Sequence, residues 1–219
     1  MARQQRAVRT REALIRSAAE IVAREGFAVT SLTGISTRAG VSNGALHFHF
    51  VSKVALVEAV EAAALERLRA VLEAPAGARS RLQHLVDVTH ALARELNSDV
   101  VLRAGFVLCG DVAWAPDVDL RAYWQRWAEG LVREAGAAAE LRPGAEPEGI
   151  VAAVVGATVG FEVLGARDTV WLASRTVARF WELLLPTLAS PGLLGTLDAG
   201  GTRGRAEPVS DGLGGRETR

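Results

Sequence analysis

Apolar residues recur at helical spacing along most of the chain. In the segment 82–96 they fall at intervals of three and four residues, which places them on one face of a helix. No two alternating segments are joined by an Asn-Gly or Asp-Gly turn, so nothing indicates a β-hairpin. Only residues 100–112, VVLRAGFVLCGDV, read as a possible strand. The pattern therefore predicts an all-α fold.

The first 50 residues divide into three short helical segments. The pattern predicts helices over about residues 10–25, 31–39 and 43–49. Thr30 or Ser31 can cap the second helix, Ser42 can cap the third, and Gly26 is placed to stop the first. Two short capped helices joined by a glycine-containing turn are typical of a helix-turn-helix, so we expect one small domain over residues 1–53.

The rest of the pattern predicts a larger helical body. A long fourth helix follows a cap at Ser52 and ends at the break that Pro75 introduces. Later helices are expected at about residues 82–96, 100–110, 118–138, 147–166 and 169–188. From residue 190 onward, glycine and scattered charge replace large apolar residues, which leaves too little surface to bury. We expect a body over residues 54–189 and a disordered tail over 190–219.

The last two helices of the body carry surfaces suited to close packing. Small residues spaced by four lie along the first of the pair, and a broad apolar stripe lies along the second. Such a pair forms either the centre of the body or a subunit interface. We expect a homodimer whose interface includes Ala152, Gly156, Gly160, Phe180, Trp181 and Leu184.

Charge is divided unevenly along the chain. The formal net charge of the 219 residues is zero, but residues 1–53 hold eight Lys or Arg against three acids, a net charge of +5. The remaining residues carry the compensating −5. Because Lys and Arg neutralise phosphates, the N-terminal segment is suited to approach a polyanion such as DNA, although a solvated basic face has the same charge.

Composition also argues against several classes of protein. The basic start is followed by no apolar signal segment, and the longest nearly apolar run, residues 150–161, is too short to span a bilayer. A single cysteine, Cys109, allows no internal disulfide and no cysteine cluster for zinc. We expect a cytoplasmic protein with no membrane partner, no metal and no cofactor.

The stretch GVSNGALHFHF, residues 40–50, matches two motifs. Its first five residues fit G-x-S-x-G, the turn that exposes a hydrolase serine after a buried strand. The preceding LTGISTRA has no β-branched run to form that strand. His47 and His49 form an H-x-H pair with no third ligand nearby for a metal. Ser42 is therefore interpreted as a helix cap rather than a nucleophile, and we expect no enzymatic activity.

A longer resemblance supports the helix-turn-helix interpretation. Residues 10–60 resemble the N-terminal domain of the TetR family of bacterial transcriptional repressors, with Gly40, Gly44, His49, Phe50 and Lys53 in the positions of its G-x-x-x-G-x-x-Y-x-H-F-x-x-K pattern. Within the family, MARQQRAVRTR, GALHFHFVSK and DVVLRAGFVL are similar to segments of the γ-butyrolactone autoregulator receptors of streptomycetes. The resemblance covers about residues 1–188.

The resemblance implies which residues meet DNA. They are Arg6, Arg9, Thr10, Ser42, Asn43, Gly44, His47, His49 and Lys53. Family members usually carry Lys at the position of Asn43 and Tyr at that of His47. Asn can read adenine through two hydrogen bonds, so the operator sequence is expected to differ from the family consensus. Phe48 and Phe50 are interpreted mainly as core residues.

The resemblance also implies a small-molecule effector. Trp124 occupies the place of the receptors' pocket tryptophan, and Trp127 lies one turn further on the same helix face, where it lines or narrows the pocket. The expected protein is a homodimeric repressor that leaves a pseudo-palindromic DNA operator when an effector such as a γ-butyrolactone binds. Two alternatives stay open: a receptor-like homologue that binds an antibiotic or no ligand, and a helical small-molecule binding protein with weakened DNA binding.

Overall fold

The computed structural model describes residues 1–74 and 80–202 of the chain. Within those ranges the regular structure is helical, with no strand and one isolated bridge between Leu141 and Ala189, so the all-α expectation is confirmed. The helices are α1 (Ala2–Glu25), α2 (Leu32–Ala39), α3 (Asn43–His49), α4 (Lys53–Leu72), α5 (Arg81–Ser98), α6 (Val100–Leu108), α7 (Leu120–Ala137), α8 (Pro147–Gly165), the 3-10 turn η1 (Thr169–Leu172), α9 (Ser174–Leu188) and α10 (Pro191–Leu194).

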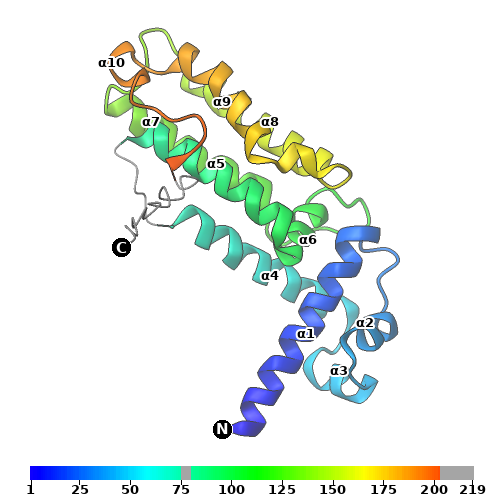
Figure 1. The fold of residues 1–219 in the computed structure, drawn as a ribbon. Helices are drawn as coiled ribbons and strands as arrows, with labels where there is room; N and C mark the ends of the chain where they lie inside the picture. Colours follow the sequence, from blue (N-terminus) through cyan, green and yellow to red (C-terminus); the bar gives the residue numbers. More distant parts are fainter. Residues whose placement is uncertain (75–79, 203–219) are drawn as a thin grey trace, which may run out of the picture.

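The helices form a small end and a larger body (Figure 1). Helices α2 and α3 lie beside α1 at one end, and the N-terminal half of α1 projects past the body on that side. The C-terminal half of α1 packs against α6, and α4 contacts both α1 and α6. Helix α5 contacts α7, α8 and α9 and so runs through the body. The small end is therefore joined to the body through α1, α4 and α6.

Serine side chains begin the helices of the small end, as the sequence predicted. The Oγ atoms of Ser31, Ser42 and Ser52 accept hydrogen bonds from the backbone N–H of the third residue of α2, α3 and α4. Ser31 caps α2, whereas the Thr30 hydroxyl donates to the carbonyl of Gly26. The turn between α2 and α3 uses Gly40 at φ 66°, a left-handed conformation that glycine adopts without strain.

Two helices differ from the sequence prediction. Helix α1 begins at Ala2 instead of residue 10, because Arg, Gln and Ala extend a helix readily. Residues 100–108 form α6, so the helix predicted at about 100–110 is confirmed over the possible strand, and Gly105 lets this helix approach Ala64 of α4 closely. The helix expected over residues 169–188 is divided into η1 and α9 at Ala173, which has an extended backbone.

The prediction of disorder from residue 190 is wrong for residues 190–202. After α10, this segment lies along α5, where the Gln83 side chain donates to the carbonyl of Asp198 at 3.0 Å and accepts from its N–H at 2.7 Å. Asp87 accepts from the backbone N–H of Thr202, and the His90 ring lies 2.9 Å from the carbonyl oxygen of Ala199. Buried polar side chains of α5 hold the segment, and Leu193, Leu194 and Leu197 add partly buried apolar contacts. Residues 203–219 lie outside the described residues.

Helix α8 forms where the sequence predicted a helix, at about residues 147–166, and it is apolar beyond the run 150–161. It spans 19 residues and is the one described helix that is long and apolar enough to cross a membrane by length and composition alone. Core helices of globular proteins meet the same measure. Glu162 of α8 is buried and accepts two hydrogen bonds from Arg121 of α7, at 2.8 and 3.1 Å. A buried ion pair to a neighbouring helix fits a position inside a protein body.

Candidate nucleic-acid interface and its connection to the body

Helix α3 has one buried side and one exposed side. Leu46 and Phe50 are buried in the small end, whereas Gly44, His47 and Phe48 are exposed on the opposite side. The Ser42 Oγ accepts from the Ala45 N–H at 3.2 Å, so Ser42 is a helix cap, as predicted. A short helix that presents its N-terminal turns to solvent has the geometry of a recognition helix in a helix-turn-helix.

The projecting part of α1 carries the free positive charge of this end. Arg6 and Arg9 are exposed, and neither forms an ion pair with any residue in the described ranges. By contrast, Arg16 and Arg38 both contact Glu20. The Thr10 hydroxyl donates to the carbonyl of Arg6 at 3.0 Å, so it is satisfied inside α1. Two exposed arginines without an ion pair are available to an anionic partner.

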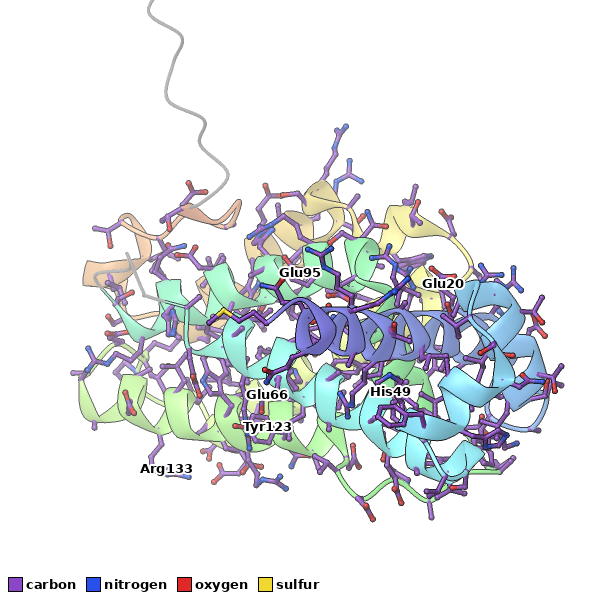
Figure 2. All side chains as sticks on the ribbon, turned by 90° about the horizontal axis from the view of Figure 1, so that it is seen from below. Glu20, His49, Glu66, Glu95, Tyr123 and Arg133 are labelled. Carbon is purple, nitrogen blue, oxygen red and sulfur yellow. The ribbon has the colours of Figure 1, made fainter. Side chains whose placement is uncertain are left out.

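The predicted residues at the C-terminal end of α3 differ in accessibility. His49 is half-buried and packs between the rings of Phe48 and Phe50, with centroid distances of 5.1 and 6.5 Å. Figure 2 views the molecule from this end and shows His49 beside α1. Lys53 is also half-buried, and its Nζ donates to the carbonyl of Phe27 at 3.1 Å. Its ammonium group points into the protein, contrary to the expectation that it faces phosphate.

The Asn43 side chain is also engaged within the small end. Its Oδ1 lies 2.6 Å from the Oγ of Ser36 on α2, which donates the hydrogen bond. A two-bond contact with adenine uses both the amide oxygen and the amide nitrogen. In this conformation the Asn43 amide oxygen is already bonded to Ser36, so contacting adenine in that way would require the oxygen to share this bond or to release it.

Phe27 joins the small end to the body. Its N–H donates to the Asp111 carboxylate at 2.6 Å, and its ring packs against Trp114 with a centroid distance of 4.6 Å. Both partners lie in the loop between α6 and α7. From the other side, the Lys53 Nζ lies 3.9 Å from the centroid of the same ring. Phe27 thus contacts the body loop and the start of α4 at once.

Trp114 continues this connection into α4. Its Nε1–H donates to the Glu61 Oε1 at 2.7 Å. Glu61 is only 4% exposed, and its Oε2 has no hydrogen-bond partner among the described residues. Burial raises the pKa of Glu61, and the hydrogen bond from Trp114 offsets part of that rise. Sequence reasoning missed these contacts because the partners are separated by 53 and 84 residues and match no local motif.

Trp124 lies in the core of the body, in a closed environment. It is 1% exposed, donates from Nε1 to the Thr158 Oγ1 at 2.8 Å, and stacks on Trp127 at 5.3 Å. Trp127 is half-buried and meets the His84 ring edge-on at 5.5 Å. A cavity of about 10 Å³ lies next to Thr158, between this residue and α5. An effector needs a larger volume than this cavity provides.

A larger groove runs between α7 and α8. It has a volume of about 660 Å³. Its apolar part includes Val151, Val155, Ala152 and Gly156, and its charged part includes Glu129, Arg133 and Glu148. Two residues predicted at a subunit interface, Ala152 and Gly156, thus also line this groove.

The predicted interface residues of α8 and α9 separate into surface and core. Ala152 and Gly156 are exposed, and Gly160, Phe180 and Leu184 are half-buried. Trp181 is fully buried within the protomer, so its assignment to a subunit interface is wrong. Leu183, two residues further along α9, is 79% exposed and was not predicted. At about 100° per residue, Trp181 and Leu183 point to nearly opposite sides of α9, and the packing of the body shows which of these sides faces the core.

Comparison with known proteins decides the family. The model of the bacterial regulatory proteins, tetR family, matches residues 14–60, a range that contains α2 and α3. The chain is also 30% identical over 202 residues to the A-factor receptor protein of Streptomyces griseus. This match covers 89% of this chain and 69% of that protein. The chain belongs to the TetR family.

Solved structures extend the likeness of this TetR-family regulator to most of its length. A γ-butyrolactone receptor described as ArpA-like matches with a TM-score of 0.72 and 25% identity, over 87% of this chain and 93% of that one. CprB of Streptomyces coelicolor, solved with its operator sequence, matches with a TM-score of 0.72 and 26% identity, over 87% and 94%. The protein is a DNA-binding transcriptional regulator of the TetR family and a homologue of the γ-butyrolactone receptors.

Proposed function

We propose that the protein is a homodimeric repressor whose two α3 helices enter successive major grooves of a pseudo-palindromic operator. The observation that carries the proposal is the exposed side of α3, together with Arg6 and Arg9 on the projecting half of α1, which form no ion pair among the described residues. Exposed base-reading positions together with phosphate-binding cations are what operator binding needs. In this proposal the protein acts in the cytoplasm, without catalysis and without a cofactor.

The dimer of this proposal forms through α8 and α9. Small or apolar side chains are exposed on both helices, and they include Ala152, Gly156, Val163, Leu164 and Leu183. An isologous dimer covers the same patch on both protomers, which removes these groups from water.

The first experiment tests DNA binding. Purified protein is mixed with a pool of genomic fragments that includes its own promoter region, and bound DNA is measured at several salt concentrations. We expect retention that falls steeply with salt, and a shallower salt slope for Arg6→Ala/Arg9→Ala, because fewer phosphates are neutralised. Arg133→Ala/Arg175→Ala, with two exposed arginines of the body, is the matched control. No salt-sensitive binding by the wild type would contradict the proposal and favour a small-molecule binding protein with weakened DNA binding.

We further propose that a small amphiphilic effector of the γ-butyrolactone class opens the core beside Trp124 and releases the operator. The support is the homology to proteins described as γ-butyrolactone receptors and the Trp124–Trp127 stack in the body. The ligand shifts the population toward a spacing of the two α3 helices that does not fit the operator.

Tryptophan fluorescence tests this effector. A long-chain γ-butyrolactone should change the emission of the wild type and of Trp171→Phe, whose indole is partly exposed on η1. The same ligand should leave the emission of Trp124→Phe nearly unchanged. A flat wild-type signal with the lactone but a response to an antibiotic would favour the receptor-like alternative.

The release signal in this proposal runs through Phe27. Its bond to Asp111 and its packing on Trp114 tie the small end to the loop that follows α6. Asp111→Ala should therefore bind DNA like the wild type but need more effector for release, because the loop is no longer hydrogen-bonded to Phe27 at the end of α1. Val112→Ala, at an exposed position of the same loop, is the control. Unchanged release in Asp111→Ala would show that another contact carries the signal.

A further inference from the structure

Phe48 occupies the centre of the exposed side of α3. Its side chain is 80% exposed, although it is one of the largest apolar groups of the small end. Leu46 and Phe50 define the buried side of the helix, and at about 100° per residue Phe48 lies roughly opposite their mean direction. The sequence interpretation of Phe48 as a core residue is therefore wrong. Its only ring contact in the described structure is with His49, at 5.1 Å.

The surroundings of Phe48 leave its ring open to a close partner. Gly44 lies one turn earlier on the same side, and a Cβ there would meet nothing nearer than the Ser42 Oγ at 4.0 Å. Nothing in the described protomer requires glycine here on steric grounds. Glycine inside a helix is about 1 kcal/mol less favourable than alanine. Val51, just after the end of α3, is 86% exposed. Phe48 is thus a large apolar side chain on a helix side that also carries the exposed Gly44 and His47.

The major groove of DNA offers one apolar group that matches such a side chain. The 5-methyl group of thymine is the only methyl among the base edges of that groove, and Phe is one of the side chains that contacts it. Asn43 is exposed as well, but its amide oxygen is bonded to Ser36, whereas the exposed Phe48 ring is available for this contact. We propose that Phe48 reads a thymine methyl group in each operator half-site. The inference rests on the proposed function and names a specificity determinant of that site.

The test compares DNA pools that differ only in this methyl group. The same genomic-fragment pool is amplified once with dTTP and once with dUTP, and the affinity of the wild-type protein for the most strongly retained fragments is measured in both forms. Removing one CH2-sized group from a buried contact corresponds to about a fourfold loss of affinity. We therefore expect the wild type to bind uracil-containing fragments at least fourfold more weakly per contacted methyl.

The variants assign the effect to Phe48. Phe48→Ala should bind both pools with equal affinity, whereas His47→Ala and Arg9→Ala should bind both more weakly and keep the wild-type ratio. Thermal unfolding of Phe48→Ala should match the wild type, because the ring packs on nothing buried. Equal binding of both pools by the wild type, or a wild-type ratio in Phe48→Ala, would overturn the inference and leave the proposed function intact. Failure of the wild type to bind either pool would overturn both.

Discussion

The DNA-facing end and the body place their large side chains in opposite ways. The small end exposes Phe48, and its Arg6 and Arg9 form no ion pair among the described residues. The body, by contrast, buries Trp124 and Trp181 completely. Groups that are exposed or unpaired add little to the stability of the protomer. The difference indicates that the residues for recognition and the residues for stability are largely separate, and that a change at one end has its main effect on a different measurement from a change at the other.

The largest expected effect on stability comes from the core of the body. Trp181→Ala should lower the free energy of unfolding by about 3–5 kcal/mol, because it leaves a large cavity between α9 and its neighbours. Chemical denaturation at several protein concentrations measures the loss.

Leu183 of the same helix supplies the matched control. Leu183→Asp replaces an exposed side chain, so the protomer should stay folded while the dimer weakens in sedimentation experiments. If Trp181→Ala instead kept its stability and only dissociated the dimer, the assignment of Trp181 to the core would be wrong.

A glycine pair sharpens the comparison between the two ends. Gly44 of α3 and Gly130 of α7 are both helical, and a Cβ meets nothing closer than 4.0 Å at Gly44 and nothing within 4 Å at Gly130. Either change to alanine should stabilise the protein by up to about 1 kcal/mol. Only Gly44→Ala should weaken DNA binding, because its methyl group separates α3 from the groove. Equal DNA affinities for both variants, measured by fluorescence anisotropy, would argue against close approach at Gly44.

The junction between the ends should respond to pH through Glu61. Burial raises the pKa of Glu61, and the charges of Asp117 and Glu58 act in the same direction. The folded protein therefore binds this proton more tightly than the unfolded chain does. The stability contributed by the protonated form is present at low pH and is lost as pH rises through the raised pKa. Glu61→Gln should reduce the fall of the free energy of unfolding with rising pH, measured by chemical denaturation at several pH values. The same pH dependence in the variant as in the wild type would contradict the assignment to Glu61.

The smallest expected effect concerns the segment 195–202 on α5. Burial lowers the pKa of His90, whose ring meets the carbonyl of Ala199. The contribution of neutral His90 to stability is therefore present above the unfolded pKa of about 6.5, and it is lost as pH falls toward the lowered pKa of the folded state. The protection of backbone amides in this segment, corrected for the intrinsic pH dependence of hydrogen exchange, should fall below about pH 6.5. His90→Gln should reduce that pH dependence, and His47→Gln, at an exposed site, should retain it.

Local rules accounted for much of the small end. Ser31, Ser42 and Ser52 begin helices where the sequence predicted caps, since an N-cap bond joins residues three apart and needs no distant partner. The family resemblance implied that Arg6 and His47 meet DNA, and both are exposed in the structure. Local rules did not show that Lys53 turns inward, because its acceptor is the carbonyl of Phe27, which lies 26 residues earlier.

The sequence by itself determined the helical class, the capped recognition helix and the basic N-terminal segment, because these depend on periodicity, nearest-neighbour hydrogen bonds and composition. Only the tertiary structure decided that Trp181 is core while Leu183 is surface, that residues 190–202 dock on α5, and that Phe27, Asp111, Trp114 and Glu61 meet at the junction. These outcomes depend on contacts between segments far apart in the chain. Such contacts leave no local pattern, since a buried carboxylate and an exposed one have the same letter in the sequence.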